Sequence, residues 1–341
     1  YYFILYEAQY IKNQSTKNAQ AVKLINGKYR FALTGTPIEN SLAELWSIFD
    51  FLMPQYLYNY HHFKETYEIP IIKNEDQEKQ AKLKRFVEPF ILRRTKKDVL
   101  TELPDKIENN VLIPFTPDEE KVYLANLSTI NTELQSAIQV NHIDKIQILA
   151  MMTRLRQLCC DQRILYNNVQ EPSSKLKACM DIIETAKENE QKVLLFSSFT
   201  KSLDLIEAEL RKKDISYYVL TGATTKIKRH QLVNAFQNDK TTVFLISLKA
   251  GGTGLNLTSA STVIHFDPWW NMSAQNQATD RAYRIGQTNN VQVYKLIMKN
   301  SIEEKIQKLQ EQKQDLSNMF IENNHGSITQ MSTADIIDLF K

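Results

Sequence analysis

Residues 242–256, T-V-F-L-I-S-L-K-A-G-G-T-G-L-N, join a short apolar run to a cluster of glycines. The run Val243–Ser247 shows no alternation with polar residues, which is typical of a strand buried on both faces of a parallel sheet. The whole chain has eight glycines, and three of them fall within residues 251–254. Because glycine lets backbone N–H groups come close to a phosphate, the stretch predicts a loop that binds a nucleotide or a nucleic-acid backbone. A plain glycine-rich turn is the alternative.

Strands and helices alternate on both sides of this stretch. The sequence predicts helices over 174–188, 200–212, 225–237 and 273–284, a long helix from Ser301, and the strands Lys192–Phe196, Tyr217–Leu220, Thr242–Ser247, Thr262–Asp267 and Val291–Ile297. This order is typical of a mostly parallel sheet that is covered by helices on both faces.

The first forty residues show a shorter version of the same pattern. They predict the strand Tyr1–Leu5, a helix over about 16–25 and the strand Tyr29–Leu33, which ends in the turn Thr34-Gly35-Thr36-Pro37. Loops at the carboxyl ends of such strands commonly bind ligands. Tyr1–Leu5 is apolar throughout, so we expect a strand covered on both faces, with neighbours that lie outside these residues. The first residue is also not Met, and we therefore expect the 341 residues to be the back part of a longer protein.

Helical segments separate the two α/β parts. Leu42, Leu45, Trp46, Phe49 and Leu52 recur at helical spacing, and residues 117–166 are helical and polar. We expect an α/β fold of two lobes, the first partial and the second complete, with helical inserts. The predicted division is 1–115 for the first lobe with its insert and connector, 116–172 for a helical protrusion of the second lobe, 173–320 for the second lobe and 321–341 for an amphipathic tail.

Composition excludes several classes of protein. The 42 basic and 39 acidic residues give a net charge of +3, so a surface for nucleic acid has to be a local patch. The three cysteines lack C-x-x-C spacing, which argues against disulfides and zinc and favours a reducing compartment. No apolar run of about 18 residues is present, and we expect no membrane span.

Two further motifs point to chemistry. On a helix, Gln277, Arg281 and Arg284 would lie on one face. Two guanidiniums and an amide on one face are the groups that would stabilise the charge of a γ-phosphoryl group in its transition state. The alternative is a solvated face on which Asp280 pairs with an arginine. Residues 267–271, D-P-W-W-N, close a strand with two tryptophans, which either pack in a core or contact a sugar–phosphate backbone. Core packing is the better interpretation for one of them.

Together these strings resemble the SWI/SNF-type branch of helicase superfamily two, whose members are DNA-dependent ATPases. The resemblance extends over nearly the whole chain and is carried by E-A-Q (7–9), L-T-G-T-P-I-E-N (33–40), L-L-F-S-S-F (194–199), the glycine cluster, D-P-W-W-N and Q-A-T-D-R-A-Y-R-I-G-Q (277–287). It implies two RecA-like lobes with ATP and Mg²⁺ between them, in a monomeric motor of the cytoplasm or nucleus. Such a motor translocates on double-stranded DNA and displaces bound proteins without separating the strands.

The resemblance also implies roles for single residues. Glu7 would position the attacking water, while Arg281 and Arg284 would be arginine fingers with Gln277 beside them at the nucleotide. Gly252, Gly254 and Asn256 would also bind the nucleotide. The residues that would bind DNA or couple it to the nucleotide site are Thr34, Gly35, Thr36, Ser197, Thr221, Gly222, Lys249, Gly251, Thr253, Trp269 and Trp270. The basic run 93–97 would connect the lobes.

Some positions depart from the family pattern. Tyr6 stands where the family has its magnesium-binding Asp, and a phenol does not replace a carboxylate as a ligand. No G-x-x-x-x-G-K-[ST] string occurs, so the main residues for ATP and Mg²⁺ are expected upstream, and the 341 residues alone are expected to be inactive. Met272, Gln275, Asn276 and Tyr283 also depart, but these changes leave the arginines in place. The alternatives are a non-hydrolysing DNA-binding or scaffold module, which Tyr6 favours, and an RNA remodeller, which D-P-W-W-N disfavours.

Overall fold

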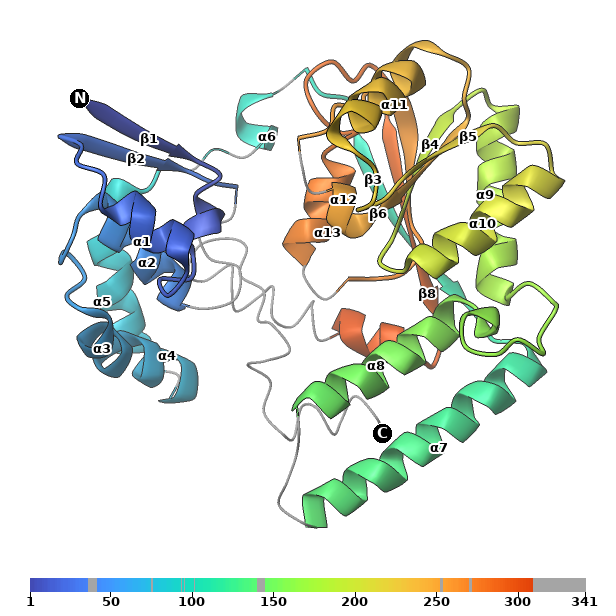
Figure 1. Ribbon diagram of the computed structural model, residues 1–341, viewed down its shortest axis with the longest axis horizontal. Coiled ribbons are helices and arrows are strands. Elements are labelled where there is room, and N and C mark those ends of the chain that lie inside the picture. Colours follow the sequence, from blue (N-terminus) through green and yellow to red (C-terminus); the bar gives the residue numbers. More distant parts are fainter. Residues whose placement is uncertain are drawn as a thin grey trace. The chain divides into compact units, whose positions relative to one another are not determined.

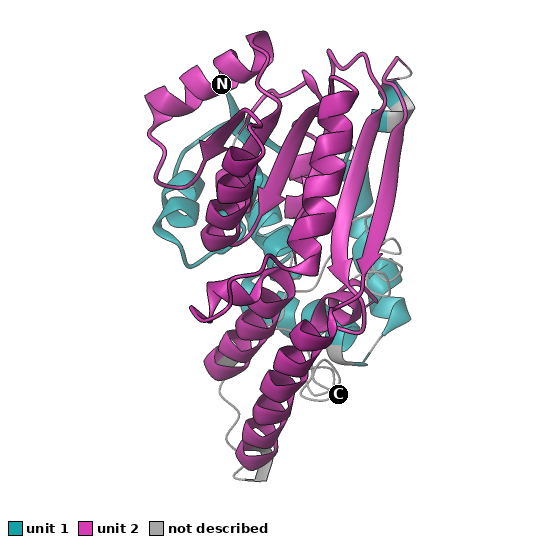
Figure 2. Ribbon diagram, turned by 90° about the vertical axis from the view of Figure 1, so that its right-hand side faces the viewer, with its two compact units in different colours: residues 1–99, 310–330 teal, residues 100–309, 331–341 magenta. Residues whose placement is uncertain are grey.

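The chain divides into two compact units. The computed structural model describes residues 1–35, 42–74, 76–92, 94, 96–100, 102–139, 145–251, 254–269 and 272–308. Described residues within 1–99 form the first unit and those within 100–308 form the second (Figure 2). The predicted tail 321–341 lies outside the described residues.

The first unit contains a small parallel sheet covered on one face. Strands β1 (Tyr2–Tyr6) and β2 (Tyr29–Leu33) pair in parallel, with Tyr2 opposite Tyr29. Phe3, Leu5 and Ala32 pack on a buried cluster from α1 (Lys17–Lys23), α2 (Leu42–Leu52) and the 3-10 turn Ala8–Ile11. The remaining described elements are α3 (Tyr60–Phe63), a π-helical turn (Lys64–Glu68), α4 (Ile69–Asn74), α5 (Gln77–Val87), a 3-10 turn (Glu88–Phe90) and α6 (Lys96–Val99).

The opposite face of this sheet is exposed. Tyr2, Ile4 and Tyr6 are 70%, 58% and 74% exposed, and Tyr29 and Phe31 of β2 lie on the same face. The described residues leave this face uncovered, and the covering neighbours expected outside these residues stay a prediction. On this face Tyr2 stacks on Tyr29 at a centroid distance of 5.0 Å.

The predicted helical stripe of the first unit is confirmed. Leu42, Leu45, Trp46 and Phe49 of α2 are buried together with residues of α3 and α5. The cluster gives the first unit a hydrophobic core of its own, separate from the sheet.

The second unit is built on a six-stranded, all-parallel sheet, which confirms the predicted fold class. Its strands, in spatial order, are β3 (Lys106–Ile113), β8 (Val291–Met298), β7 (Ala260–His265), β4 (Lys192–Ser197), β6 (Val243–Ser247) and β5 (Tyr217–Leu220). Its helices are α7 (Pro117–Gln139), α8 (Lys145–Cys160), α9 (Ser174–Glu188), α10 (Thr200–Lys212), α11 (Lys226–Asn238), α12 (Leu248–Gly251) and α13 (Met272–Thr279), with a 3-10 turn (Gln162–Ile164) and a helical segment at 302–308.

Helices cover both faces of this sheet. Helices α9 and α10 lie on one face, and α11, α12 and α13 lie on the other (Figure 1). Phe244 and Ile246 of β6 belong to the cluster that includes Phe236 of α11 and Ala278 of α13. Burial on both sides explains why the central strands read as continuous apolar runs.

Strand β3 was not predicted, and it moves the boundary between the units. Its eight residues pair with β8 over the full length, so residues 100–115 belong to the second unit rather than to the first lobe. β3 is an edge strand with exposed polar positions, and Glu108 bonds Lys295 of β8 at 2.6 Å. A half-solvated edge strand lacks the apolar run that identifies the central strands.

The predicted helical character of residues 117–166 is confirmed by α7 and α8. The two helices lie side by side and extend beyond the end of the sheet (Figure 1). Arg154 of α8 donates from Nε to Asn126 Oδ1 of α7 at 2.8 Å. None of the helices in the described part of the chain is both long and apolar enough to cross a membrane.

Candidate functional site

The predicted site residues of the second unit gather at one edge of its sheet. Because all six strands are parallel, their carboxyl ends meet at the same edge, where open α/β sheets bind ligands. Ser197 ends β4, Thr221 and Gly222 follow β5, Lys249 and Gly251 follow β6, and Trp269 follows β7. These strands are consecutive neighbours in the order β7-β4-β6-β5, so the four segments form one row, which we call the carboxyl edge.

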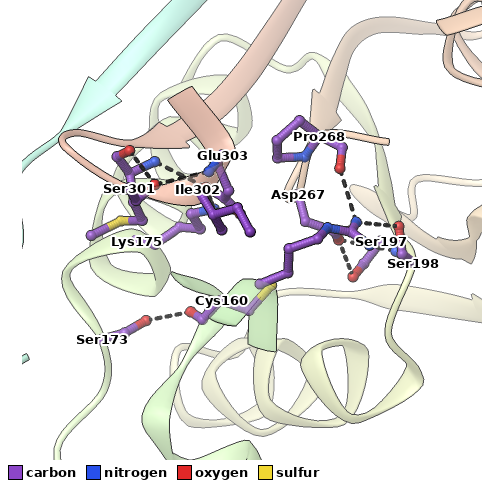
Figure 3. Close-up of polar contacts among 12 residues, drawn as sticks. Cys160, Ser173, Lys175, Ser197, Ser198, Asp267, Pro268, Ser301, Ile302 and Glu303 are labelled. Carbon is purple, nitrogen blue, oxygen red and sulfur yellow. Dashed lines mark hydrogen bonds and ion pairs between the residues drawn. The ribbon is translucent and has the colours of Figure 1, made fainter. Parts of the chain in front are cut away.

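A buried carboxylate ties two of these segments together. Asp267, 3% exposed, lies two residues beyond β7. Its Oδ1 accepts hydrogen bonds from Ser197 Oγ at 2.6 Å and from the Ser198 N–H at 3.0 Å (Figure 3). Since the Ser197 side chain is 1% exposed and engaged here, the structure places it in a buried network and not on a DNA-facing surface.

Sequence reasoning missed the cation that faces this carboxylate. Arg156 of α8 donates from Nη2 to Asp267 Oδ2 at 3.1 Å, and the two side chains are 4% and 0% exposed. The partners are 111 residues apart in the chain, and no motif joined them. From sequence alone, an arginine in a polar helical insert is expected to be a surface residue.

A second buried ion pair lies close to this network. Lys175 of α9 contacts Glu303 Oε2 at 2.5 Å and Oε1 at 2.7 Å, and both side chains are fully buried (Figure 3). Burial lowers the pKa of Lys175, but the negative charge of the neighbouring Glu303 outweighs it, so the pKa is raised and the ammonium stays charged. Glu303 also accepts from the Met298 N–H at the end of β8.

Trp269 is half-buried and packs against the hydrophobic cluster of the second unit. Its backbone N–H donates to Gln275 Oε1 at 3.2 Å, so one of the positions that departs from the family pattern holds the tryptophan segment in place. The structure thus gives Trp269 a packing role, whereas Trp270 lies outside the described residues.

The segment that contains the glycine cluster, residues 249–256, is called the glycine segment below. Close packing and an unusual backbone angle determine its conformation. A Cβ at Gly251 would lie 3.0 Å from Phe196 Cε1, whereas a Cβ at Gly222 would meet no atom within 4 Å. Gly254 has a backbone φ of +37°, an angle that residues other than glycine rarely adopt. Lys249, Gly254 and Asn256 are exposed, while Gly252 and Thr253 lie outside the described residues.

The two predicted arginine fingers face this segment, but not from one regular helix. Helix α13 ends at Thr279, so the expected helix to residue 284 is wrong. Beyond Thr279 the i−4 pattern gives way to tighter turns, in which the Arg281 N–H donates to Ala278 O and the Ala282 N–H to Thr279 O. The Arg281 carbonyl accepts from the Leu257 N–H at 2.9 Å. Arg281 Nε donates to Gly251 O and Arg284 Nη1 donates to Leu255 O, each at 3.1 Å. Gln277 is half-buried on α13.

A buried glutamine fixes the turn after these arginines. Gln287, 5% exposed, donates from Nε2 to Ala260 O at 2.8 Å and to Ala282 O at 3.2 Å. Gly286 adopts φ +100° just before it. The last residue of the 277–287 string is therefore structural, and its place in that string was the only signal for it.

In the first unit, a side-chain relay joins the ends of the two strands. Glu7 follows β1 with φ 58° and ψ 56°, in the left-handed region that non-glycine residues rarely adopt. Its Oε2 accepts from Gln9 Nε2 at 2.6 Å, and Gln9 Oε1 accepts from Thr34 Oγ1 at 2.8 Å. The E-A-Q string alone indicates no role for Gln9, and the structure makes it the link between Glu7 and Thr34. Gly35 follows in an exposed turn, and Thr36 lies outside the described residues.

The described residues do not fit a protein-held Mg²⁺ site. Tyr6 is 74% exposed and offers a phenol at the position where the family has its metal-binding carboxylate, and a phenol does not replace that ligand. Among the residues that the structure describes, no group of three or more His, Cys, Asp or Glu side chains is placed to hold a metal ion.

Comparisons with known proteins match this arrangement along the whole chain. Residues 1–164 match the SNF2-related domain family, and residues 174–286 match the helicase conserved C-terminal domain family. The chain is 39% identical to an uncharacterised ATP-dependent helicase of Mycoplasma genitalium, covering 100% of this chain and 32% of that protein. It is 31% identical to an ISWI chromatin-remodeling complex ATPase of Saccharomyces cerevisiae, again covering 100% of this chain and 32% of that one.

A solved structure defines the class. The Sulfolobus solfataricus SWI2/SNF2 ATPase core in complex with double-stranded DNA is similar with a TM-score of 0.58 and 38% identity, covering 99% of this chain and 72% of that chain. The parallel sheets of the two units are those of RecA-like lobes. The chain belongs to the SWI2/SNF2 family of ATPases, as the sequence motifs predicted, and it spans about a third of the curated relatives above.

His265 at the end of β7 makes the stability of the second unit depend on pH. The ring is buried, with Nε2 2.9 Å from Thr279 Oγ1, and burial, with a smaller effect of Lys295, lowers the pKa to about 3. Below the ordinary pKa of about 6.5 the unfolded chain binds a proton that the folded chain excludes, so stability is lost as pH falls from about 6.5 toward 3.

We predict that His265→Gln flattens this dependence. Between about pH 6.5 and 5 the wild type should lose up to about 2 kcal/mol more of its free energy of unfolding than the variant, at about 1.4 kcal/mol per pH unit. Urea unfolding at both pH values measures the difference. The exposed His230→Gln is the control and should follow the wild type; equal pH dependence of wild type and His265→Gln would contradict the account.

Proposed function

We propose that this chain is the part of a double-stranded-DNA translocase that carries the arginine fingers and the DNA-coupling segments. The observation that carries the proposal is the carboxyl edge of the second unit, where Arg281 and Arg284 lie against carbonyls of the glycine segment next to the exposed Lys249. Membership in a family of ATP-dependent DNA motors supports the same function.

The described residues would divide the work of ATP hydrolysis. Arg281 and Arg284, with Gln277 beside them, would leave their carbonyl partners and stabilise the charge that develops on the transferred phosphoryl group. Glu7 would orient the attacking water, because Gln9 holds its carboxylate. The bond from Thr34 to Gln9 would make the turn after β2 sensitive to the state of Glu7.

Double-stranded DNA is the proposed track. Lys249 and the backbone amides around Gly222 and Gly251 would contact phosphates, which gives affinity without reading sequence. The DNA-bound form of the Sulfolobus core and the chromatin-remodelling ATPase among the relatives support this partner. We further propose that the motor is monomeric and displaces proteins from DNA, and that residues 116–172 serve as its helical protrusion.

The ATP phosphates and Mg²⁺ would be held mainly by residues outside these 341. The absence of a G-x-x-x-x-G-K-[ST] string and the phenol of Tyr6 support this proposal. By itself the chain would therefore be inactive, since phosphate positioning and metal bridging contribute much of the catalysis in phosphoryl transfer. A non-hydrolysing DNA-binding or scaffold module is the second candidate, and Tyr6 is the observation that favours it.

A reducing compartment, the cytoplasm or the nucleus, is the proposed location. All three cysteines of the sequence, Cys159, Cys160 and Cys179, are free and buried. Burial raises the pKa of each thiol above its ordinary value, which keeps it protonated and unreactive.

Duplex binding tests the DNA part of the proposal directly. We predict that the 341-residue chain binds duplexes of different sequence equally and that affinity falls steeply with salt. Lys249→Ala should weaken binding and reduce the slope of log K against log salt by about one. Lys187→Ala, an exposed lysine at the far end of α9, is the matched control and should leave the slope unchanged. Sequence-selective binding that is insensitive to salt would contradict the proposal.

ATP hydrolysis tests the catalytic part. We predict no DNA-stimulated hydrolysis from the 341 residues alone. In a protein that carries a phosphate loop N-terminal to residue 1, Tyr6→Asp should raise the rate by about 10²-fold or more, because it restores a metal ligand. Arg281→Ala should lower any such rate by about 10³-fold. Normal DNA-stimulated hydrolysis with Tyr6 in place would show that another carboxylate holds the metal.

A further inference from the structure

One buried arginine of the helical insert grips two segments of the carboxyl edge at once. The Nη2 of Arg156 donates to Asp267 Oδ2 at 3.1 Å and to Pro268 O at 2.9 Å in the segment after β7. The same nitrogen lies 3.4 Å from Ser198 Oγ in the segment after β4. The guanidinium thus bridges the ends of two neighbouring strands from a helix that belongs to neither.

Aromatic rings fix the plane of this guanidinium. Its carbon lies 5.1 Å from the Phe199 ring centroid and 5.5 Å from that of Trp269, one ring from each segment. Cation–π contacts on this scale are stronger when the cation is desolvated, as it is here at 4% exposure. A lysine would offer a point charge without the flat, forked geometry that fits both rings and both acceptors.

The contact also determines the position of α8 relative to the edge. Arg156 lies near the C-terminal end of α8, where Ser173 Oγ donates to Cys160 O at 2.8 Å (Figure 3). A shift of α8 along its axis would pull the guanidinium away from Asp267 and leave a buried carboxylate without its cation, which is strongly unfavourable. The helix and the two edge segments are therefore expected to move together.

We propose that Arg156 is a positioning residue that couples the α7–α8 insert to the DNA-contacting edge. It contacts neither DNA nor ATP; it holds the segments 198–199 and 267–269 in the geometry that duplex binding requires. The inference rests on the proposed DNA function and deepens it, because it names the side chain through which the insert acts on the edge.

The test compares matched substitutions on one helix in the 341-residue chain. Arg156→Gln removes the charge, and Arg156→Lys keeps the charge but removes the fork. Arg154→Gln makes the same chemical change two residues away, where the side chain contacts Asn126 and Tyr166 and not the edge. Amide hydrogen exchange at 198–199 and 267–269 is measured without DNA, and duplex affinity is measured by fluorescence anisotropy over a range of salt concentrations.

Both Arg156 variants should speed exchange in the two segments by at least about tenfold, while Arg154→Gln leaves it unchanged. Both should weaken duplex binding by about tenfold with the salt slope unaltered, because a buried arginine neutralises no phosphate. The double variant Arg156→Gln/Asp267→Asn should show little further increase in exchange rate and little further loss of duplex affinity, since the two residues act as one unit.

Three results would overturn the inference. The first is unchanged exchange in both Arg156 variants. The second is a salt slope that falls by about one in these variants, which would indicate a direct phosphate contact. The third is an effect of Arg154→Gln equal to that of Arg156→Gln. If Arg156→Gln does not fold, the exchange rates and duplex affinity of Arg156→Lys decide whether Arg156 has the positioning role. If the wild type does not bind duplex DNA, the proposed function fails, and the exchange comparison alone then decides the positioning role.

Discussion

The carboxylate of Asp267 is the contact on which the arrangement of the carboxyl edge depends. The hydrophobic core holds six parallel strands together, but apolar packing does not direct the segments that leave them. Direction comes from a buried anion that accepts from Ser197 and Ser198 at the end of β4 and from Arg156 of α8. Three elements far apart in the sequence are fixed by one group, which is stable in the interior only while all of its donors remain.

The glycine segment is held by arginine side chains that donate to its backbone carbonyls, and not by a buried carboxylate. There the anchors are backbone carbonyls, and Arg281 and Arg284 donate to Gly251 O and Leu255 O. A neutral carbonyl holds a guanidinium less strongly than a buried carboxylate does, because the carboxylate adds the attraction of a full opposite charge in a medium of low dielectric constant. The edge therefore combines a half held by a buried carboxylate, around Asp267, with a half in which the guanidiniums of Arg281 and Arg284 donate to backbone carbonyls.

Sequence patterns predicted the interior of the fold better than its edges. Strands β4 and β6 were predicted correctly because burial on both faces demands continuous apolar runs, and β5 and β8, which are only partly buried, were predicted as well. β3 was missed since an exposed edge strand shows no such run. The end of α13 was misplaced because tight turns replace the helix after Thr279, and the sequence pattern does not show where that change occurs. Motif strings made Glu7, Arg281 and the glycine segment candidate site residues. They did not reveal Gln9, Gln287 or Arg156, whose roles come from partners that only the folded chain brings near.

The central claim is that duplex DNA binds at the carboxyl edge of the second unit. Amide hydrogen exchange of the 341-residue chain, measured with and without a short duplex of arbitrary sequence, tests it most directly. The account predicts added protection in the segments that follow β4, β5, β6 and β7, at 198–199, 221–223, 248–251 and 267–269, and no change at the opposite ends of these strands. Protection confined to the opposite edge, around 188–191 and 213–216, would contradict it.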